Sequence, residues 1–252
     1  MRRIVIISAV AAVAISSLVW AQAKPAAMPI PDGKPAPGAL VPADTSKDPN
    51  LKITEGSGGM STSPIIANAP LRSDYVMGAD SAPLVMVEYA SLTCPHCAHF
   101  SNAVLPELEK RYIETGKMRY VLRPFPLNEP ALKAAMLVDC VGEQSQSRYY
   151  TFSRVLFDAQ NKWAFDGNFM AGLETIANVG GLSKEEFMNC MSNTDREMRV
   201  LKIKKEASDE LKVPHTPYIF IGGEVYGGER TVDAMSKFID AKLADLAGKN
   251  SK

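Results

Sequence analysis

The chain has 252 residues, 46% of them hydrophobic, and its 28 basic and 28 acidic residues leave no net charge. This size and composition suit one globular domain with a hydrophobic core and additional tails. A general nucleic-acid-binding protein is not expected, because no basic surplus is present to neutralise phosphates.

Residues 1–23 have the features of a secretory signal peptide. Two arginines precede an apolar run over residues 4–20, and the small residues on either side of Gln22 form a cleavage site that ends at Ala23. We expect cleavage after Ala23 and a periplasmic protein, in which cysteines tend to be oxidised. The alternative is an uncleaved membrane anchor with the remaining chain facing the periplasm, because the apolar run just reaches spanning length.

Residues 24–63 carry seven of the 17 prolines and neither an aromatic residue nor a cysteine. Such a segment buries too little apolar surface to offset the entropy that ordering would cost. We predict a disordered, proline-rich tether of extended character. It lacks the heptads of an oligomerising coiled coil, so we expect a monomer whose folded part begins near Pro64.

A strand, a helix and a second strand are predicted within residues 64–128. Residues 83–91 form the dense apolar run of a buried strand, interrupted by a single acid, Glu88. A helix is expected over residues 99–117 and a strand over residues 118–127. Because a helix connects the two strands within a short stretch, the strands should be parallel neighbours in one sheet.

Residues 129–211 have a helical pattern throughout. The glycines and capping signatures indicate where these helices begin and end. Helices are predicted over residues 131–141, 147–160 and 168–181, and two more begin at the capping-box pairs Ser183 with Glu186 and Thr194 with Glu197.

Cys140 and Cys190 lie on separate apolar helical stretches of this block. They could be free buried thiols, a structural disulfide or a secondary redox pair. In an oxidising compartment the structural disulfide is favoured, and it would contribute about 4 kcal/mol in the chain-entropy model.

Residues 212–247 are predicted to form strands and then a helix. Gly222 and Gly223 separate two β-rich runs within residues 216–228, which indicates a tight antiparallel hairpin. An amphipathic helix is predicted over residues 231–246. Residues 248–252 are a short tail.

The motif at residues 94–97, Cys-Pro-His-Cys, follows the first strand. Haem attachment needs a histidine directly after the second cysteine, where Ala98 stands. A structural zinc site usually has a second cysteine pair, and only His96 and His99 are near, so no metal is expected. A permanent disulfide here would close too small a loop to stabilise the fold much. A redox-active disulfide, with no other cofactor, is the hypothesis that remains.

The position of the motif indicates which way the electrons run. Cys94 falls where a strand ends and a helix begins, so its sulfur faces unpaired N–H groups and the positive end of the helix dipole. Both stabilise a thiolate, and His96, if protonated, adds a second positive charge. Pro95 suits the first helical turn, where its missing N–H costs nothing. Because a stabilised thiolate favours the reduced form, the Cys94–Cys97 disulfide should be an oxidant.

These residues carry a resemblance to a known family. The Cys-Pro-His-Cys motif, entered from a strand that carries Glu88, resembles the thioredoxin superfamily. The Pro95-His96 dipeptide and the helical insertion are similar to its DsbA family of periplasmic thiol-disulfide oxidoreductases, over about residues 65–247. The resemblance implies an α/β thioredoxin fold in the order βαβ, inserted helical domain, ββα.

The resemblance also implies a role for each matching residue. Cys94 would be the exposed nucleophile that forms a mixed disulfide with a substrate, and Cys97 the buried thiol that resolves it. Thr216 and Pro217 match a loop with a cis-proline beside the disulfide, and Thr216 would offer backbone hydrogen bonds to an extended substrate. Glu88 is either a surface-facing strand residue or, as its spacing favours, a partly buried acid of raised pKa that relays the proton of Cys97.

We therefore expect a dithiol oxidase that donates its disulfide to reduced, unfolded secreted proteins. The resemblance implies that a membrane quinone-linked partner re-oxidises it. The alternatives are a disulfide isomerase or reductase on the same fold, and a non-catalytic metal-binding protein that uses Cys94, Cys97 and a histidine. Thr216 leaves the strength of the oxidant open, because family members differ at that position.

Overall fold

The computed structural model of the protein describes residues 74–165 and 167–250. The signal peptide predicted at residues 1–23 and the tether predicted at residues 24–63 lie outside the described residues and stay predictions. No helix in the described part of the chain is long and apolar enough to cross a membrane.

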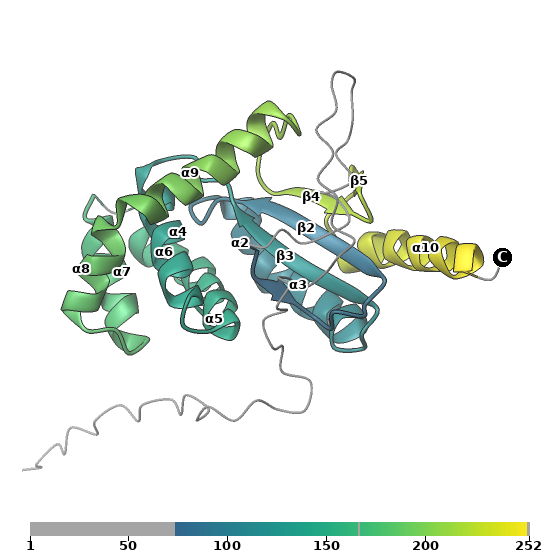
Figure 1. Ribbon diagram of the computed structural model, residues 1–252, viewed down its shortest axis with the longest axis horizontal. Coiled ribbons are helices and arrows are strands. Elements are labelled where there is room, and N and C mark those ends of the chain that lie inside the picture. Colours follow the sequence, from purple (N-terminus) through teal and green to yellow (C-terminus); the bar gives the residue numbers. More distant parts are fainter. Residues whose placement is uncertain (1–73, 166, 251–252) are drawn as a thin grey trace, which may run out of the picture. The chain divides into compact units, whose positions relative to one another are not determined.

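A mixed sheet with the strand order β1-β3-β2-β4-β5 lies at the centre of the fold (Figure 1). Its strands are β1 (Val76–Met77), β2 (Leu84–Ala90), β3 (Met118–Pro124), β4 (Tyr218–Ile221) and β5 (Glu224–Val225). β2 and β3 are parallel, which confirms the predicted βαβ unit, and β4 is antiparallel to β2. The sequence did not predict β1, because two residues are too few to show a periodic pattern.

A helix interrupted by π-helical turns connects β2 to β3. In chain order its parts are α2 (Pro95–His99), η2 (Phe100–Val104), α3 (Leu105–Leu108) and η3 (Glu109–Ile113). Pro106 lies in its middle and has no N–H to give to the carbonyl four residues earlier. The helix adjusts just before it, where the Leu105 N–H donates to the Phe100 carbonyl five residues back. The regular helix expected over residues 99–117 is therefore broken into these parts.

The remaining helices form the insertion and the C-terminal end. They are α4 (Glu129–Gly142), α5 (Gln146–Asp158), α6 (Gln160–Trp163), α7 (Phe169–Val179), α8 (Lys184–Ser192), α9 (Thr194–Asp209) and α10 (Val232–Asn250). α8 begins with the predicted capping box, in which Ser183 and Glu186 bond each other's backbone N–H groups. The capping box predicted at Thr194 is wrong, because Asn193 is the N-cap of α9 and its side chain accepts the Arg196 N–H. Asparagine caps a helix at least as well as threonine.

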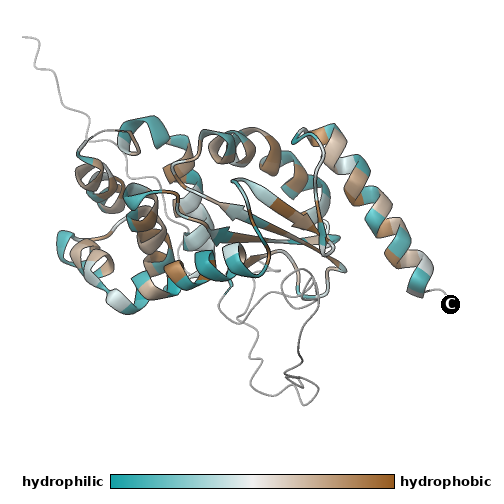
Figure 2. Cartoon of the chain, turned by 90° about the horizontal axis from the view of Figure 1, so that it is seen from above, coloured by the Kyte–Doolittle hydropathy of each residue, from teal (hydrophilic) through white to brown (hydrophobic). Residues whose placement is uncertain are grey.

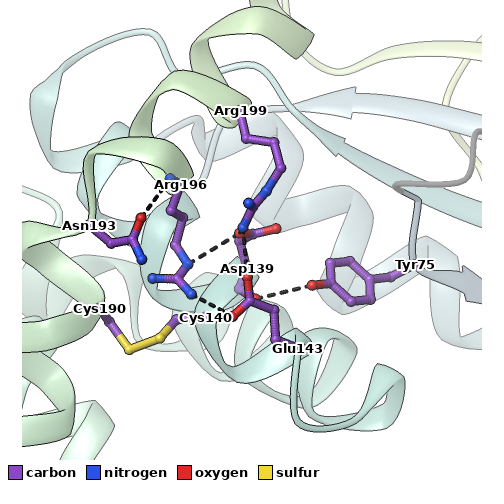
Figure 3. Close-up of polar contacts among 8 residues, drawn as sticks. All are labelled: Tyr75, Asp139, Cys140, Glu143, Cys190, Asn193, Arg196 and Arg199. Carbon is purple, nitrogen blue, oxygen red and sulfur yellow. Dashed lines mark hydrogen bonds and ion pairs between the residues drawn. A yellow bond between two sulfur atoms is a disulfide. The ribbon is translucent and has the colours of Figure 1, made fainter.

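A disulfide and a cluster of ion pairs hold α4 against α8 and α9 (Figure 3). Cys140 of α4 is bonded to Cys190 of α8, so of the three alternatives for these cysteines the structure contains the disulfide. Beside it, Arg199 of α9 lies 2.6 Å from Asp139 of α4. Arg196 of α9 is also bound to this end of α4, because its guanidinium lies 3.2 Å from Asp139 and 2.7 Å from Glu143, the residue that follows the helix. These contacts fasten the end of α4 to the helices that return the chain to the sheet.

The predicted hairpin after residue 216 is confirmed. β4 and β5 pair antiparallel, and Gly222 and Gly223 between them have φ values of +60° and +88°. Glycine adopts this left-handed region without the penalty that a Cβ would bring.

The side chains of β2 alternate between two hydrophobic cores, one on each face of the sheet. Leu84 and Met86 belong to the core that includes residues of α2, α3 and α10, whereas Val85 and Val87 pack with residues of α9. Figure 2 shows the central strands as hydrophobic along most of their length. Glu88 lies two residues after Met86 and four after Leu84, so its side chain is on the same face of the strand. The strand therefore places an acid on the face that α2 covers.

Candidate active site

Cys94 is the N-cap residue of α2, and Pro95 occupies the first position of that helix. This confirms the prediction that the Cys94 sulfur lies where a strand ends and a helix begins. The description of Cys94 as exposed is wrong, because only 7% of the residue is accessible. The loop at residue 216 covers it, and the Cys94 thiol donates a hydrogen bond to the Thr216 carbonyl at 3.4 Å.

The surroundings of Cys94 favour its anion. Hydrogen bonding from the Cys97 thiol is the largest cause that lowers the pKa of Cys94, to about 5 from an ordinary value of 9.0. Burial opposes this effect, whereas the backbone N–H groups of Cys97 and His96 add to it. His96 contributes its backbone N–H to these donors, and its imidazole is exposed, so the positive charge expected there stays a prediction.

Cys97 lies one helical turn inward and is fully buried. Burial raises its pKa far above the ordinary value of a thiol, and the hydrogen bond with Cys94 and the charge of Glu88 act in the same direction. The two sulfurs are therefore unequal, since Cys94 is stabilised as a thiolate and Cys97 as a thiol.

Glu88 is buried in the sheet, with 1% of its surface accessible. Its pKa is raised to about 8, chiefly by burial, and the charge of Cys94 acts in the same direction. A hydrogen bond from the Tyr120 hydroxyl to Oε2, at 2.5 Å, and the charge of Arg230 act in the opposite direction. The other carboxyl oxygen, Oε1, has no hydrogen-bond partner among the described residues. Of the two interpretations of Glu88, the surface-facing one is excluded.

The Thr216–Pro217 peptide bond is cis, and both residues are buried. Arg230, from the segment that precedes α10, donates to the Pro217 carbonyl at 3.1 Å. His215, just before this loop, is exposed and packs its ring edge-on against Tyr218. The loop therefore brings residues from the C-terminal half of the chain over Cys94.

Sequence reasoning missed three residues that contact this site: Tyr120, Gln160 and Arg230. The Gln160 amide, at the start of α6, donates to the Leu92 carbonyl at 2.8 Å and to the Cys94 carbonyl at 3.2 Å. No local sequence pattern predicts such a contact. Tyr120 had a usable signal, because in parallel pairing it stands two residues from Leu122, the partner of Glu88, and so shares the face of the acid.

The alternative to a redox centre at the cysteine motif is a metal site. Within residues 74–165 and 167–250, no group of three or more His, Cys, Asp or Glu side chains is placed to hold a metal ion. His96 and His99 both extend into solvent.

Comparison with known proteins identifies a family model, curated relatives and solved structures that are similar to this chain. The model of the protein family described as Thioredoxin matches residues 71–241. A protein of Rickettsia felis named "Putative protein-disulfide oxidoreductase" is 31% identical over 173 residues, which cover 69% of this chain and 61% of that protein. The crystal structure of alpha-DsbA1 from Wolbachia pipientis is 32% identical, with a TM-score of 0.67, over 71% of this chain and 96% of that chain. This chain therefore spans only about three fifths of the length of the curated relatives such as the Rickettsia protein.

Proposed function

This chain belongs to the DsbA-like family of thioredoxin-fold protein-disulfide oxidoreductases, and on that premise we propose that it is a dithiol oxidase. It would donate the Cys94–Cys97 disulfide to reduced, unfolded secreted proteins in the periplasm. A membrane quinone-linked partner would re-oxidise it. The boundaries at residues 128 and 211 between the two halves of the fold and the inserted helices belong to the same proposal.

The inequality of the two sulfurs carries this proposal. Lowering the pKa of a thiol favours the dithiol over the disulfide, by about 30 mV of potential for each pKa unit. With the pKa of Cys94 near 5 instead of 9.0, the effect is on the order of 100 mV toward a stronger oxidant. Reduction of such a disulfide releases a stable thiolate, so the disulfide is readily donated to a substrate.

The reaction would proceed in two exchanges. A substrate thiolate attacks Sγ of Cys94, the Cys94–Cys97 bond breaks, and Cys97 leaves with the electron pair. Because the pKa of Cys97 is strongly raised, its sulfur needs a proton at once. Glu88, whose pKa of about 8 keeps it protonated at neutral pH, can supply that proton.

In the second exchange, another substrate thiolate attacks the substrate sulfur of the mixed disulfide. Cys94 leaves as its stabilised thiolate, so the substrate is oxidised by two electrons and the protein is reduced to the dithiol. The Thr216 backbone, beside Cys94, would hold the extended substrate during both exchanges.

The equilibrium with glutathione tests this function. An oxidase should reach half-reduction at a potential well above the thioredoxin value of about −270 mV. A potential near that value would indicate a reductase or isomerase. Cys94→Ser should abolish disulfide transfer, whereas Cys97→Ser should accumulate mixed disulfides with substrates. An equal loss in both variants, without trapped species, would contradict the assigned roles.

A further inference from the structure

Tyr120 makes the hydrogen bond that fixes the buried acid. Its hydroxyl lies 2.5 Å from Oε2 of Glu88, and both residues are 1% accessible. The contact follows from the sheet, because β2 and β3 run parallel with Glu88 opposite Leu122. Tyr120 stands two residues before Leu122 and therefore on the same face as the acid.

The carboxyl of Glu88 has two unequal oxygens. Oε2 accepts the phenol hydroxyl, whereas Oε1 is buried and has no hydrogen-bond partner among the described residues. An unpaired buried polar atom is costly, and its persistence at a reacting centre points to a role there. Cys97 of α2 packs in the same hydrophobic core as Leu84 and Met86, on the face of the sheet that Glu88 shares, and the charge of Glu88 acts on its thiol.

The groups that surround Glu88 come from several elements of the fold. β3 contributes Tyr120, α2 and its N-cap contribute Cys97 and Cys94, and Arg230 faces the acid from the segment before α10. Helix α5 contributes Tyr149 and Tyr150, which act on Tyr120, and β4 places the apolar Ile219 beside the acid.

We propose that Tyr120 is a positioning residue, which holds Oε2 so that Oε1 is the oxygen that exchanges a proton with Sγ of Cys97. The inference rests on the proposed function, since it concerns the step in which Cys97 gains or loses its proton. When Cys97 attacks a mixed disulfide at Cys94, its proton passes to Oε1 and the partner thiolate leaves. In the opposite direction Oε1 returns the proton to the departing Cys97 sulfur.

The decay of a mixed disulfide between Cys94 and glutathione isolates this step. The reduced full-length protein is mixed with oxidised glutathione, quenched with acid at successive times, and followed by mass spectrometry. The decay rate should rise with pH as Glu88 loses its proton. Tyr120→Phe removes a hydrogen bond that favours the charged carboxylate, so the midpoint should move to higher pH by about one unit.

The chain offers a matched control in Tyr149. Its buried hydroxyl donates to the Leu122 carbonyl at 2.9 Å, so Tyr149→Phe also removes one buried hydrogen bond but none to the acid. The midpoint should stay at the wild-type value in Tyr149→Phe. In a Glu88→Gln background, Tyr120→Phe should cause no further change. Equal midpoints in the two phenylalanine variants, or a shift that persists without the acid, would overturn the proposal.

A second substitution covers the case in which Tyr120→Phe does not fold. Tyr120→3-fluorotyrosine keeps the hydroxyl and makes it a stronger donor, so the midpoint should move to lower pH. No movement would count against the proposal. The oxidase hypothesis is tested separately, because a reductase on this fold also forms the mixed disulfide. A low redox potential would refute the oxidase, while the pH midpoints of the decay rate would still decide the role of Tyr120.

Discussion

The reduced and oxidised proteins should differ in stability in a pH-dependent way, because only the reduced form carries the Cys94 thiolate. Its pKa is about 5 in the folded protein against an ordinary value of 9.0. An acid whose pKa is lowered by folding contributes stability that is fully present above its unfolded pKa and is lost as the pH falls through the folded pKa. The advantage of the reduced form should therefore grow from pH 5 to pH 9 and disappear below pH 5.

The expected size follows from linkage. At pH 7 the thiolate lies about two pH units above its folded pKa, which corresponds to about 2.7 kcal/mol. Cys94 lies just under the surface, with the exposed Pro95 and His96 beside it, so solvent screens part of this interaction. We expect a measured difference of about 1–2 kcal/mol in the free energy of unfolding at pH 7.

Urea unfolding of both forms, followed by far-ultraviolet circular dichroism at pH values from about 4 to about 9, measures this difference. Carboxylates far from Cys94 act equally in both forms and largely cancel, whereas Glu88, whose pKa the charge of Cys94 raises, contributes to the difference above pH 7. The variant Cys94→Ser, which has no thiolate at this position, provides the control and should lack the pH-dependent term. A constant difference between the reduced and oxidised forms across the range would refute the assignment of a stabilised thiolate.

Three substitutions elsewhere have expected outcomes of their own. Glu88→Gln should raise the free energy of unfolding at pH 7 by about 2 kcal/mol, because the folded protein no longer keeps a buried acid protonated against its ordinary pKa of 4.5. Chemical denaturation should show that the gain vanishes near pH 4, and a gain independent of pH would contradict it. Cys140→Ser should lower the free energy of unfolding by up to about 4 kcal/mol and leave the redox potential unchanged. The double variant Cys140→Ser/Cys190→Ser controls for the Cys190 thiol that the single variant leaves without a partner. An altered redox potential would argue against a purely structural disulfide. Gln160→Ala should cost about 1–2 kcal/mol in thermal or urea unfolding, since the Leu92 carbonyl loses a buried donor, whereas a neutral result would show that water replaces the amide.

Local patterns allowed most of the fold to be predicted. Strand β2, the hairpin at Gly222 and the capping box at Ser183 each depend on residues close together in sequence, so their signals survive without tertiary information. β1 is too short to carry such a signal, and Pro106 broke the regularity of a helix whose location was predicted. At α9 two neighbouring residues, Asn193 and Thr194, could both cap, and only packing decides between them.

The site was less predictable because its chemistry comes from contacts across long sequence separations. Cys94 was expected to be exposed, but the Thr216 carbonyl that covers it lies 122 residues further along the chain. The partner of Glu88 lies 32 residues away, on the neighbouring strand. The motif itself indicated which sulfur is stabilised as a thiolate, because the start of a helix supplies N–H groups locally.

These contacts make the low pKa of Cys94 a property of the folded state. The hydrogen bonds of the Cys94 sulfur involve both its own helix, whose N–H groups lower its pKa, and Thr216, which the C-terminal half supplies. Gln160, which belongs to the inserted helices, holds the carbonyls at the entrance to α2. If the start of α6 opens, the first turn of α2 loses the amide that holds its carbonyls, and the N–H groups that lower the pKa of Cys94 lose their alignment. On the proposed function the disulfide would then be a weaker oxidant, so part of the free energy that orders this segment would contribute to its redox potential.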